Sequence, residues 1–262
     1  MVRINGEKCI GCGKCAEDCL ALNIEVRKTA SVQGACIQCG HCVAVCPTGA
    51  VAIPEYDMDD VEEYRPDDFC LDPGQVLRSI KFRRSIRSYK QKKVPENDLE
   101  LLVQAGRYTA TAKNCQSNGF VIIQDGLEQL KQMVWDYIDE IEKRDGQNIA
   151  PELRPYIGFN HRRKADPADD YLFRNAPVVL FITSDYVLDA GLAAQNMETM
   201  AVSLGMGVLY NGYLARIADT NEALKGWLGI ENRTIRACML VGYPDRSYVR
   251  TAPRKTADVI WM

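Results

Sequence analysis

The sequence predicts two domains, a small cysteine-rich domain followed by a larger one that mixes helices and strands. Eight of the eleven cysteines fall within residues 9–46, where the spacing C-x2-C-x2-C-x3-C occurs twice. After residue 75 the apolar residues alternate between helical spacing and short continuous runs, a pattern typical of helices packed on buried strands. With 262 residues, 47% of them hydrophobic, the chain is long enough for both domains to have a core.

The repeated cysteine spacing is that of bacterial ferredoxins with two [4Fe-4S] clusters. A cubane cluster binds four thiolates. In the two-cluster arrangement each run supplies three ligands to one cluster and its fourth cysteine to the other. We therefore expect one cluster on Cys9, Cys12, Cys15 and Cys46, and a second on Cys36, Cys39, Cys42 and Cys19. Pro47 follows the second run as is usual, whereas Leu20 stands at this place in the first run.

Disulfides and zinc sites are the alternative uses of these cysteines, and the spacing disfavours both. Zinc motifs pair two C-x2-C knuckles across a longer loop and do not need a third cysteine two residues further on. Secreted disulfide frameworks are small, whereas this chain is long and lacks an apolar N-terminal signal segment. The three remaining cysteines, Cys70, Cys115 and Cys238, are interpreted as ordinary thiols, and the sequence predicts no role for them.

Charge and hydropathy exclude two classes of partner. A net charge of −3 argues against nucleic-acid binding, which needs a clustered basic excess. No apolar run approaches the length that crosses a bilayer, so no membrane association is expected. We expect a soluble protein of a reducing compartment, the cytoplasm.

An acidic stretch separates the two predicted domains. The segment from Glu55 to Asp72 holds nine acidic residues against one arginine and is interrupted by prolines. Such a segment is typical of an exposed, self-repelling linker, although an acidic docking face for a basic redox partner is an alternative. The predicted boundaries are therefore 1–55 for the ferredoxin domain, 56–75 for the linker and 76–262 for the second domain.

Periodicity predicts the elements of the second domain. Apolar residues at helical spacing predict helices over 99–106, 127–141 and 188–204. The last is apolar nearly all round, and helices of that kind are buried, often between subunits. Short apolar runs predict buried strands over 120–123, 178–183, 208–210 and 238–241. The charged stretch 145–175 predicts a long loop or short-helix excursion, and loops of this length are often lids. In it, His161, Arg162 and Arg163 either cap an anionic substrate or form a solvated basic loop.

Four motifs, in order, resemble those of the nitroreductase family of flavoproteins. The first is Arg83-Arg84-Ser85-Ile86-Arg87, and the second is the polar stretch within 109–120. The third combines residues 195–197 with the turn at 204–207, and the fourth combines 241–244 with the basic tail 250–255. Together they cover roughly residues 78 to 258, which is more specific than any one motif alone. Ser117-Asn118 departs from the family's frequent Pro-Trp, and Cys115 replaces a commoner small residue.

The resemblance implies FMN as the cofactor of this domain. Arg83, Arg84, Ser85, Arg254 and Lys255 would hold its phosphate, where guanidinium groups bind oxygens in pairs. Arg87 would lie near the flavin N1/O2 edge, where a cation stabilises the reduced anionic flavin. Asn114 and Gln116 would bind the pyrimidine or ribityl portion, and the backbone at Asn211 and Gly212 would lie near N5.

The fold that the resemblance implies is an α+β sandwich, a mainly antiparallel sheet flanked by helices, in a homodimer with FMN at the subunit interface. Periodicity alone does not distinguish this sheet from a doubly wound one. No G-x-G-x-x-G follows a predicted strand, so a separate nicotinamide-binding domain is not expected.

The two domains together predict an FMN-dependent oxidoreductase in which the clusters relay electrons to FMN. The donor would be a low-potential ferredoxin-type protein or NAD(P)H, and the acceptor a small molecule such as a nitroaromatic or a quinone. No catalytic side chain is predicted, because the flavin carries most of the chemistry. One alternative is an electron-transfer module that serves a protein partner and has no small substrate. Another is a specialised relative of the same superfamily, such as a flavin-destructase or dehalogenase relative.

Overall fold

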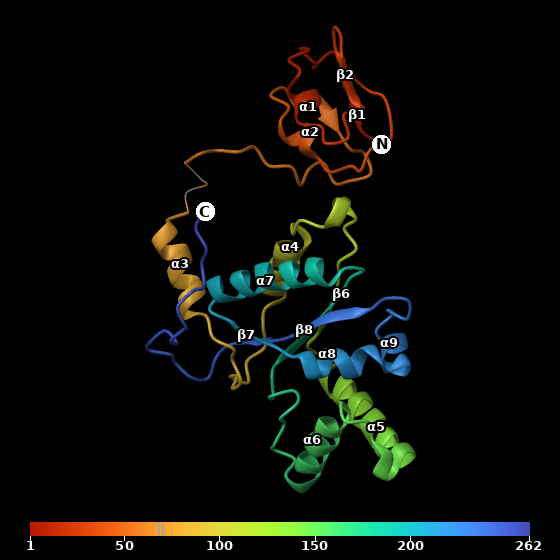
Figure 1. Ribbon diagram of the computed structural model, residues 1–262, viewed down its shortest axis with the longest axis vertical. Coiled ribbons are helices and arrows are strands. Elements are labelled where there is room, and N and C mark those ends of the chain that lie inside the picture. The colour runs from red at the N-terminus through yellow and green to blue at the C-terminus, as the bar shows by residue number, and fades with distance from the viewer. Residues whose placement is uncertain (68, 70) are drawn as a thin grey trace. The chain divides into compact units, whose positions relative to one another are not determined.

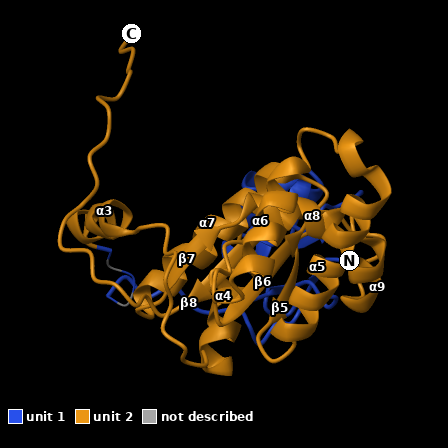
Figure 2. Ribbon diagram, turned by 90° about the horizontal axis from the view of Figure 1, so that it is seen from below, with its two compact units in different colours: residues 1–71, 111–116 blue, residues 72–110, 117–262 orange. Residues whose placement is uncertain are grey.

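A computed structural model describes residues 1–67, 69 and 71–262 of the chain (Figure 1). The predictions for Asp68 and Cys70 lie outside the described residues. The chain divides into two compact units, residues 1–71 with 111–116 and residues 72–110 with 117–262 (Figure 2). Most of the predicted linker 56–75 thus groups with the N-terminal unit, and a helix, α3 (Pro73–Phe82), already begins within it. The reason is a local start signal: the Asp72 carboxylate accepts a hydrogen bond from Gln75 N at 2.7 Å, and proline occupies the first helical position.

The N-terminal unit contains two short antiparallel strand pairs. Strand β1 (Arg3–Ile4) pairs with β4 (Val51–Ala52), and β2 (Ile24–Val26) pairs with β3 (Ala30–Val32). The apolar stretch after the first cysteine run therefore forms a hairpin. The stretch after the second run returns to the start of the chain, which closes the unit around its cysteines.

Each cysteine run contains a single-turn helix, which includes its third cysteine. Helix α1 (Lys14–Glu17) begins after Gly13, and α2 (His41–Ala44) begins after Gly40. Both glycines adopt left-handed backbone angles, with φ of +83° and +78°, which a residue with a side chain rarely adopts. The glycines let each run turn sharply between its second and third cysteine, so that the thiols of one run can face a common space.

The core of this unit is small and includes two of the cysteines themselves. Its buried members are Val2, Cys15, Ala30, Cys42, Val51 and Ile53. A core of this size supplies little hydrophobic stabilisation, so a bound metal group would contribute substantially to the stability of the unit.

The second unit is built on a four-stranded sheet in the order β5-β6-β8-β7, in which every pair is antiparallel. Its strands are β5 (Gly119–Ile123), β6 (Val178–Thr183), β7 (Gly207–Tyr210) and β8 (Ile235–Gly242). An isolated parallel bridge joins Ser85 to Val208 beside β7. The α+β fold class is confirmed.

Helices cover both faces of this sheet, so it is buried on both sides (Figure 1). On one face, Val178, Leu180 and Ile182 of β6 pack with α4 (Glu96–Arg107) and α7 (Val187–Ser203). On the other face, Val179 and Phe181 pack with four further helices. These are α5 (Leu127–Asp145), α6 (Arg154–Ala165), α8 (Gly212–Asp219) and α9 (Glu222–Trp227). Successive residues of a strand point to opposite faces, which explains why β6 reads as one continuous apolar run.

Helix α7 is buried on one side only. Ala190, Ala194 and Met197 face the sheet, whereas Leu188 and Leu192 are 71% and 43% exposed. Within one chain the helix is thus buried against the sheet on one side, and its expected burial between subunits stays a prediction. No helix in the described residues combines the length and apolar character needed to cross a membrane.

The charged stretch 145–175 forms a short-helix excursion, as expected. It contains the short 3-10 turn η2 (Gly146–Asn148) and α6, and then returns to β6. Tyr156 and Phe173 from this stretch are fully buried in the core, so the excursion is packed onto the unit.

Candidate functional site

Four cysteines drawn from both runs line one cavity in the N-terminal unit. Cys9, Cys12 and Cys15 come from the first run and Cys46 from the second, and all four line the same cavity. The lining also includes Gly11, Gly13 and Val51.

The other four cysteines line a second cavity. Here Cys36, Cys39 and Cys42 come from the second run and Cys19 from the first. In the described residues, no three His, Cys, Asp or Glu side chains are grouped so that they could hold a single metal ion. Four thiols that line one cavity without converging on a single ion are the arrangement that a four-iron cubane needs.

Backbone N–H groups point at three of these sulfurs. Ala30 N donates to Cys9 Sγ, Gln38 N to Cys36 Sγ and Ala50 N to Cys46 Sγ, each at 3.3 Å. Such donors stabilise negative charge on sulfur, which suits thiolate ligands of a metal cluster.

The thiols differ in how readily they ionise. Burial raises the pKa of Cys15 and of Cys42, and neighbouring cysteines raise both further by repulsion between thiolates. At Cys46, burial is the largest influence and raises the pKa, but hydrogen bonds from the backbone of Thr48 and Ala50 together lower it below the usual value. A positively charged metal group would favour the thiolate form of all these side chains.

The segment Thr111–Gln116 belongs structurally to the N-terminal unit, although the chain on either side of it belongs to the second. Asn114 Nδ2 donates to the backbone oxygens of Ile37 and Gln38, at 3.1 and 3.0 Å. Gln116 Nε2 donates to the Tyr56 hydroxyl at 2.9 Å. The amide donors that were predicted to bind flavin thus have protein acceptors here, and their assignment to the cofactor stays a prediction.

In the second unit, the turn Arg83–Ser85 joins α3 to the edge of the sheet. Ser85 bridges to Val208 of β7, and Ile86 N donates to Val208 O at 3.0 Å. Arg84 Nε is buried and has no hydrogen-bond partner among the described residues. A buried donor without a partner is unfavourable, so an anion beside this turn would satisfy it.

Arg83 is held by an acidic residue that the sequence reasoning missed. Its Nη1 lies 3.2 Å from Oε1 of Glu198, whose side chain is only 2% exposed. Tyr210 Oη donates to Glu198 Oε2 at 3.2 Å and also to Ala194 O at 3.1 Å. Burial, followed by the Glu198 charge, raises the Tyr210 pKa, so this hydroxyl stays protonated and remains a donor. The available signal was a glutamate within a largely apolar helix, which also carries Asp189.

The other predicted flavin contacts are spread over three segments. Arg87 is exposed, and its Nη1 donates to Ser85 O at 3.3 Å. The Asn211 side chain caps α8 through Leu214 N and donates to Leu172 O, and its backbone N–H donates to Cys238 O at 2.8 Å, so the predicted contact of this backbone with the flavin stays a prediction. A Cβ added to Gly212 would meet no atom within 4 Å, so the backbone there faces open space.

The basic tail has no regular secondary structure in this chain. Arg254 and Lys255 are exposed, and Arg254 Nη1 donates to Pro253 O at 3.1 Å, within the tail itself. Among the described residues, no hydrogen bond or ion pair joins these two residues to the Arg83–Ser85 turn. Their assignment to the phosphate stays a prediction.

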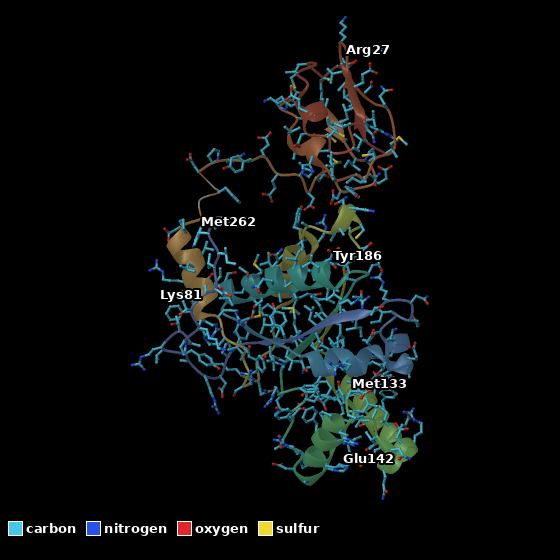
Figure 3. The ribbon with its side chains drawn as sticks, in the orientation of Figure 1. Arg27, Lys81, Met133, Glu142, Tyr186 and Met262 are labelled. Carbon is cyan, nitrogen blue, oxygen red and sulfur yellow. The ribbon has the colours of Figure 1, made fainter. Side chains whose placement is uncertain are left out.

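The basic residues of the excursion are paired on helix α6. His161 Nε2 lies 2.5 Å from Oε1 of Glu142, which is labelled near the end of α5 in Figure 3. Arg162 donates to Asp169, and the Arg163 guanidinium lies 4.9 Å from the ring centre of Trp135. The three side chains therefore lie on a helix rather than in a loop, and their contacts link α6 to neighbouring residues.

The chain matches two protein-family models. Residues 1–47 match the 4Fe-4S dicluster domain, and residues 80–243 match the nitroreductase family. Among curated proteins, it is 25% identical over 179 residues to a protein of Methanothermobacter thermautotrophicus named provisionally as an NADH dehydrogenase/NAD(P)H nitroreductase. This match covers 64% of the chain and 77% of the relative.

Solved structures share the fold of the second unit. A nitroreductase with bound FMN from Bacteroides fragilis aligns with a TM-score of 0.58 and 23% identity, covering 72% of this chain and 98% of its own. Another with bound FMN, from Desulfitobacterium hafniense, aligns with a TM-score of 0.55 and 18% identity, covering 71% and 98%. Because its family match spans more than half of its length, this chain belongs to the nitroreductase family and carries a 4Fe-4S dicluster domain ahead of the family domain.

Proposed function

We propose that this protein is an FMN-dependent oxidoreductase in which two [4Fe-4S] clusters relay electrons to FMN for the reduction of a small acceptor, such as a nitroaromatic or a quinone. One observation carries the proposal: eight thiols surround two cavities, four to each, in the same chain as a nitroreductase domain. Iron–sulfur clusters transfer single electrons, and a flavin collects two of them and delivers a pair.

The residues of the N-terminal unit fit the clusters. Each cavity is lined by three thiols of one run and one of the other, which is the ligand exchange of two-cluster ferredoxins. The N–H groups of Ala30, Gln38 and Ala50 would stabilise the negative charge that each cluster and its thiolates carry.

The residues of the second unit fit an anionic cofactor at the end of α3. Arg84 Nε offers an unused buried donor, and Arg83 and Ser85 flank it, so this turn would hold the FMN phosphate. Arg254 and Lys255 would add charge when the tail closes over the phosphate. Arg87 would place a cation where the reduced flavin is negative, and the open backbone at Gly212 would leave room for the ring.

FMN as the cofactor is also supported by the solved relatives, since both compared nitroreductases contain it. The provisional name of the curated relative supports NAD(P)H as one electron donor, and the cluster domain supports a low-potential ferredoxin-type donor as the other. We propose a cytoplasmic location, because thiolate ligands need a reducing compartment.

A homodimer is part of the same proposal. Val76, Leu77 and Ile80 of α3 are exposed, as are Leu188 and Leu192 of α7. Exposed apolar side chains on helices of one unit are typical of a surface that a second subunit covers.

The test is anaerobic purification followed by analysis of iron, sulfide and flavin. We expect about eight irons and one FMN per chain. Stepwise reduction by a low-potential ferredoxin should then bleach the cluster bands before or together with the flavin band. Iron without flavin would contradict the enzyme, and flavin without iron would contradict the relay.

A cysteine variant separates relay from direct reduction. Cys36→Ala should lose one cluster, keep FMN and slow flavin reduction by ferredoxin, whereas Cys115→Ser, a cysteine outside both cavities, should retain all the iron. Unimpaired flavin reduction by ferredoxin in Cys36→Ala would show that this cluster does not lie on the electron path.

A further inference from the structure

Asn114 is linked to Cys36 through a single peptide group. Its Nδ2 donates to Ile37 O at 3.1 Å, and the N–H of the same peptide, Gln38 N, donates to Cys36 Sγ at 3.3 Å. The second proton of Nδ2 is directed to Gln38 O at 3.0 Å. A donor on a carbonyl polarises its peptide and strengthens the N–H bond at the other end.

The segment that carries Asn114 is held in an unusual conformation. Lys113, Asn114 and Gln116 have φ of +51°, +55° and +48°, the left-handed region that residues other than glycine seldom occupy. The hydrogen bonds that hold this turn include those from Gln116 N to Thr111 Oγ1 at 3.0 Å and from Gln116 Nε2 to the Tyr56 hydroxyl at 2.9 Å. Strained residues persist where the surrounding contacts over-determine them and commonly accompany a functional contact.

We propose that Asn114 is a positioning residue that raises the reduction potential of the cluster held by Cys36, Cys39, Cys42 and Cys19. The inference rests on the clusters of the proposed function. Reduction adds one electron to the cluster, and hydrogen bonds to its sulfurs stabilise the added negative charge. By polarising the Ile37–Gln38 peptide, the Asn114 amide strengthens the bond to Cys36 Sγ and so favours the reduced form.

The effect is confined to one cluster. The sulfurs of the first site receive their donors from Ala30 and Ala50, in the body of the N-terminal unit. In the second site, the donor is Gln38 N, and its peptide is bonded to Asn114. Asn114 lies in the segment 111–116, which is inserted between parts of the chain that belong to the second unit. The sequence of the reductase domain therefore sets the potential of one cluster and not of the other.

The experiment is EPR-monitored reduction by dithionite at controlled potentials, on the full chain purified anaerobically. The test variant is Asn114→Gly, because glycine accepts φ of +55° and removes only the side chain. We expect one of the two cluster potentials to become more negative and the other to stay unchanged. In a Cys36→Ala background, which lacks the second cluster, Asn114→Gly should not move the remaining potential.

The matched control is Gln116→Gly. Gln116 is an uncharged amide in the same left-handed turn, but it donates to Tyr56 rather than to the cluster loop, so neither potential should shift. If Asn114→Gly loses iron, the variant Asn114→Asp tests the inference instead. Aspartate tolerates the same backbone angles but places a carboxylate against the two carbonyls. That variant should shift the second potential further in the negative direction.

Unchanged potentials in an Asn114→Gly protein with full iron would overturn the inference, and so would equal shifts of both clusters. A wild-type protein without iron would instead contradict the proposed function. The two failures are therefore distinguishable, and neither readout depends on turnover.

Discussion

Arg83 and Glu198 form an ion pair that joins the turn after α3 to the sheet-facing side of α7. The guanidinium Nη1 lies 3.2 Å from the carboxylate, and the Glu198 side chain is 2% exposed against 28% for Arg83. A carboxylate this deeply buried needs its cation, because an unpaired buried charge is strongly destabilising. The pair therefore fixes the position of an arginine that we assign to the FMN phosphate.

Arg83→Met should destabilise the second unit by about 3 kcal/mol, since it leaves the Glu198 carboxylate buried with only the Tyr210 hydroxyl. The measurement is urea unfolding followed by tryptophan fluorescence, because Trp135, Trp227 and Trp261 all lie in that unit. The double variant Arg83→Met with Glu198→Met should recover much of the loss.

Arg87→Met is the matched control for this prediction. Arg87 lies in the same basic stretch but is exposed, and its bond is to a backbone oxygen, so its loss should change stability by only a few tenths of a kcal/mol. An equal loss in both variants would show that the pair with Glu198 is not what stabilises the turn.

Gly207 marks a close approach between β7 and the Arg83–Ser85 turn. A Cβ at this position would lie 2.2 Å from Ile86 Cγ1, so Gly207→Ala must push the turn away from the strand. We expect a loss of about 1–3 kcal/mol and weaker FMN binding, measured by urea unfolding and by flavin fluorescence on dilution.

Gly226→Ala provides the comparison for that variant. A Cβ at Gly226 would meet only Glu231 Oε1, at 3.9 Å. Gly226 lies in helix α9, and in a helix alanine is favoured over glycine by about 0.5–1 kcal/mol. Stability should therefore rise slightly. Unaltered stability and flavin binding in Gly207→Ala would mean that the turn is not held against β7 as the structure indicates.

Periodicity predicted the elements of the second unit closely, for a physical reason. The run 178–183 is strand β6, whose side chains are buried on both faces and therefore all apolar. The helix predicted over 188–204 is α7, Val187–Ser203. Composition could not show which side of α7 faces the sheet, because small and large apolar residues alternate around it, and Leu188 and Leu192 proved to be exposed.

The sequence alone could not predict contacts between residues that are far apart along the chain. The spacing of the cysteines led to the expectation that each cavity would mix the two runs, because that spacing belongs to a known geometry. Nothing local to Asn114 indicates a bond to Ile37, which lies 77 residues away, and nothing near Arg83 indicates Glu198. Such pairs depend on the tertiary fold, which hydrophobic patterning specifies only in outline.

Alkaline pH should weaken the second unit through its buried tyrosines. Burial raises the pKa of Tyr156 from 10.0 to about 12, and its hydroxyl donates to Tyr213 O at 2.9 Å. Between pH 10 and 12 the unfolded chain releases this proton while the folded chain keeps it, so stability falls as the pH rises. Burial raises the pKa values of Tyr89 and Tyr210 as well, and both add to the fall.

Urea unfolding at pH 9 and at several values up to pH 12 measures this slope. In Tyr156→Phe the slope should be shallower by about one proton. A wild-type slope retained in Tyr156→Phe would mean that this hydroxyl does not hold its proton through folding.

Removal of iron should unfold the N-terminal unit and leave the second unit intact. The N-terminal core consists of a few small apolar residues together with Cys15 and Cys42, so the clusters would replace much of the missing hydrophobic stabilisation. The sheet of the second unit is covered by helices on both faces and contains none of the eight thiols. After oxidation and chelation of the full chain, hydrogen exchange should become fast in residues 1–55 while β6 and β8 remain protected.

The segment 111–116 should lose protection together with residues 1–55, because Asn114 and Gln116 are bonded to that unit. Slow exchange in residues 1–55 after complete loss of iron would show that the small core suffices without the clusters, and the cavities would then be preformed sites.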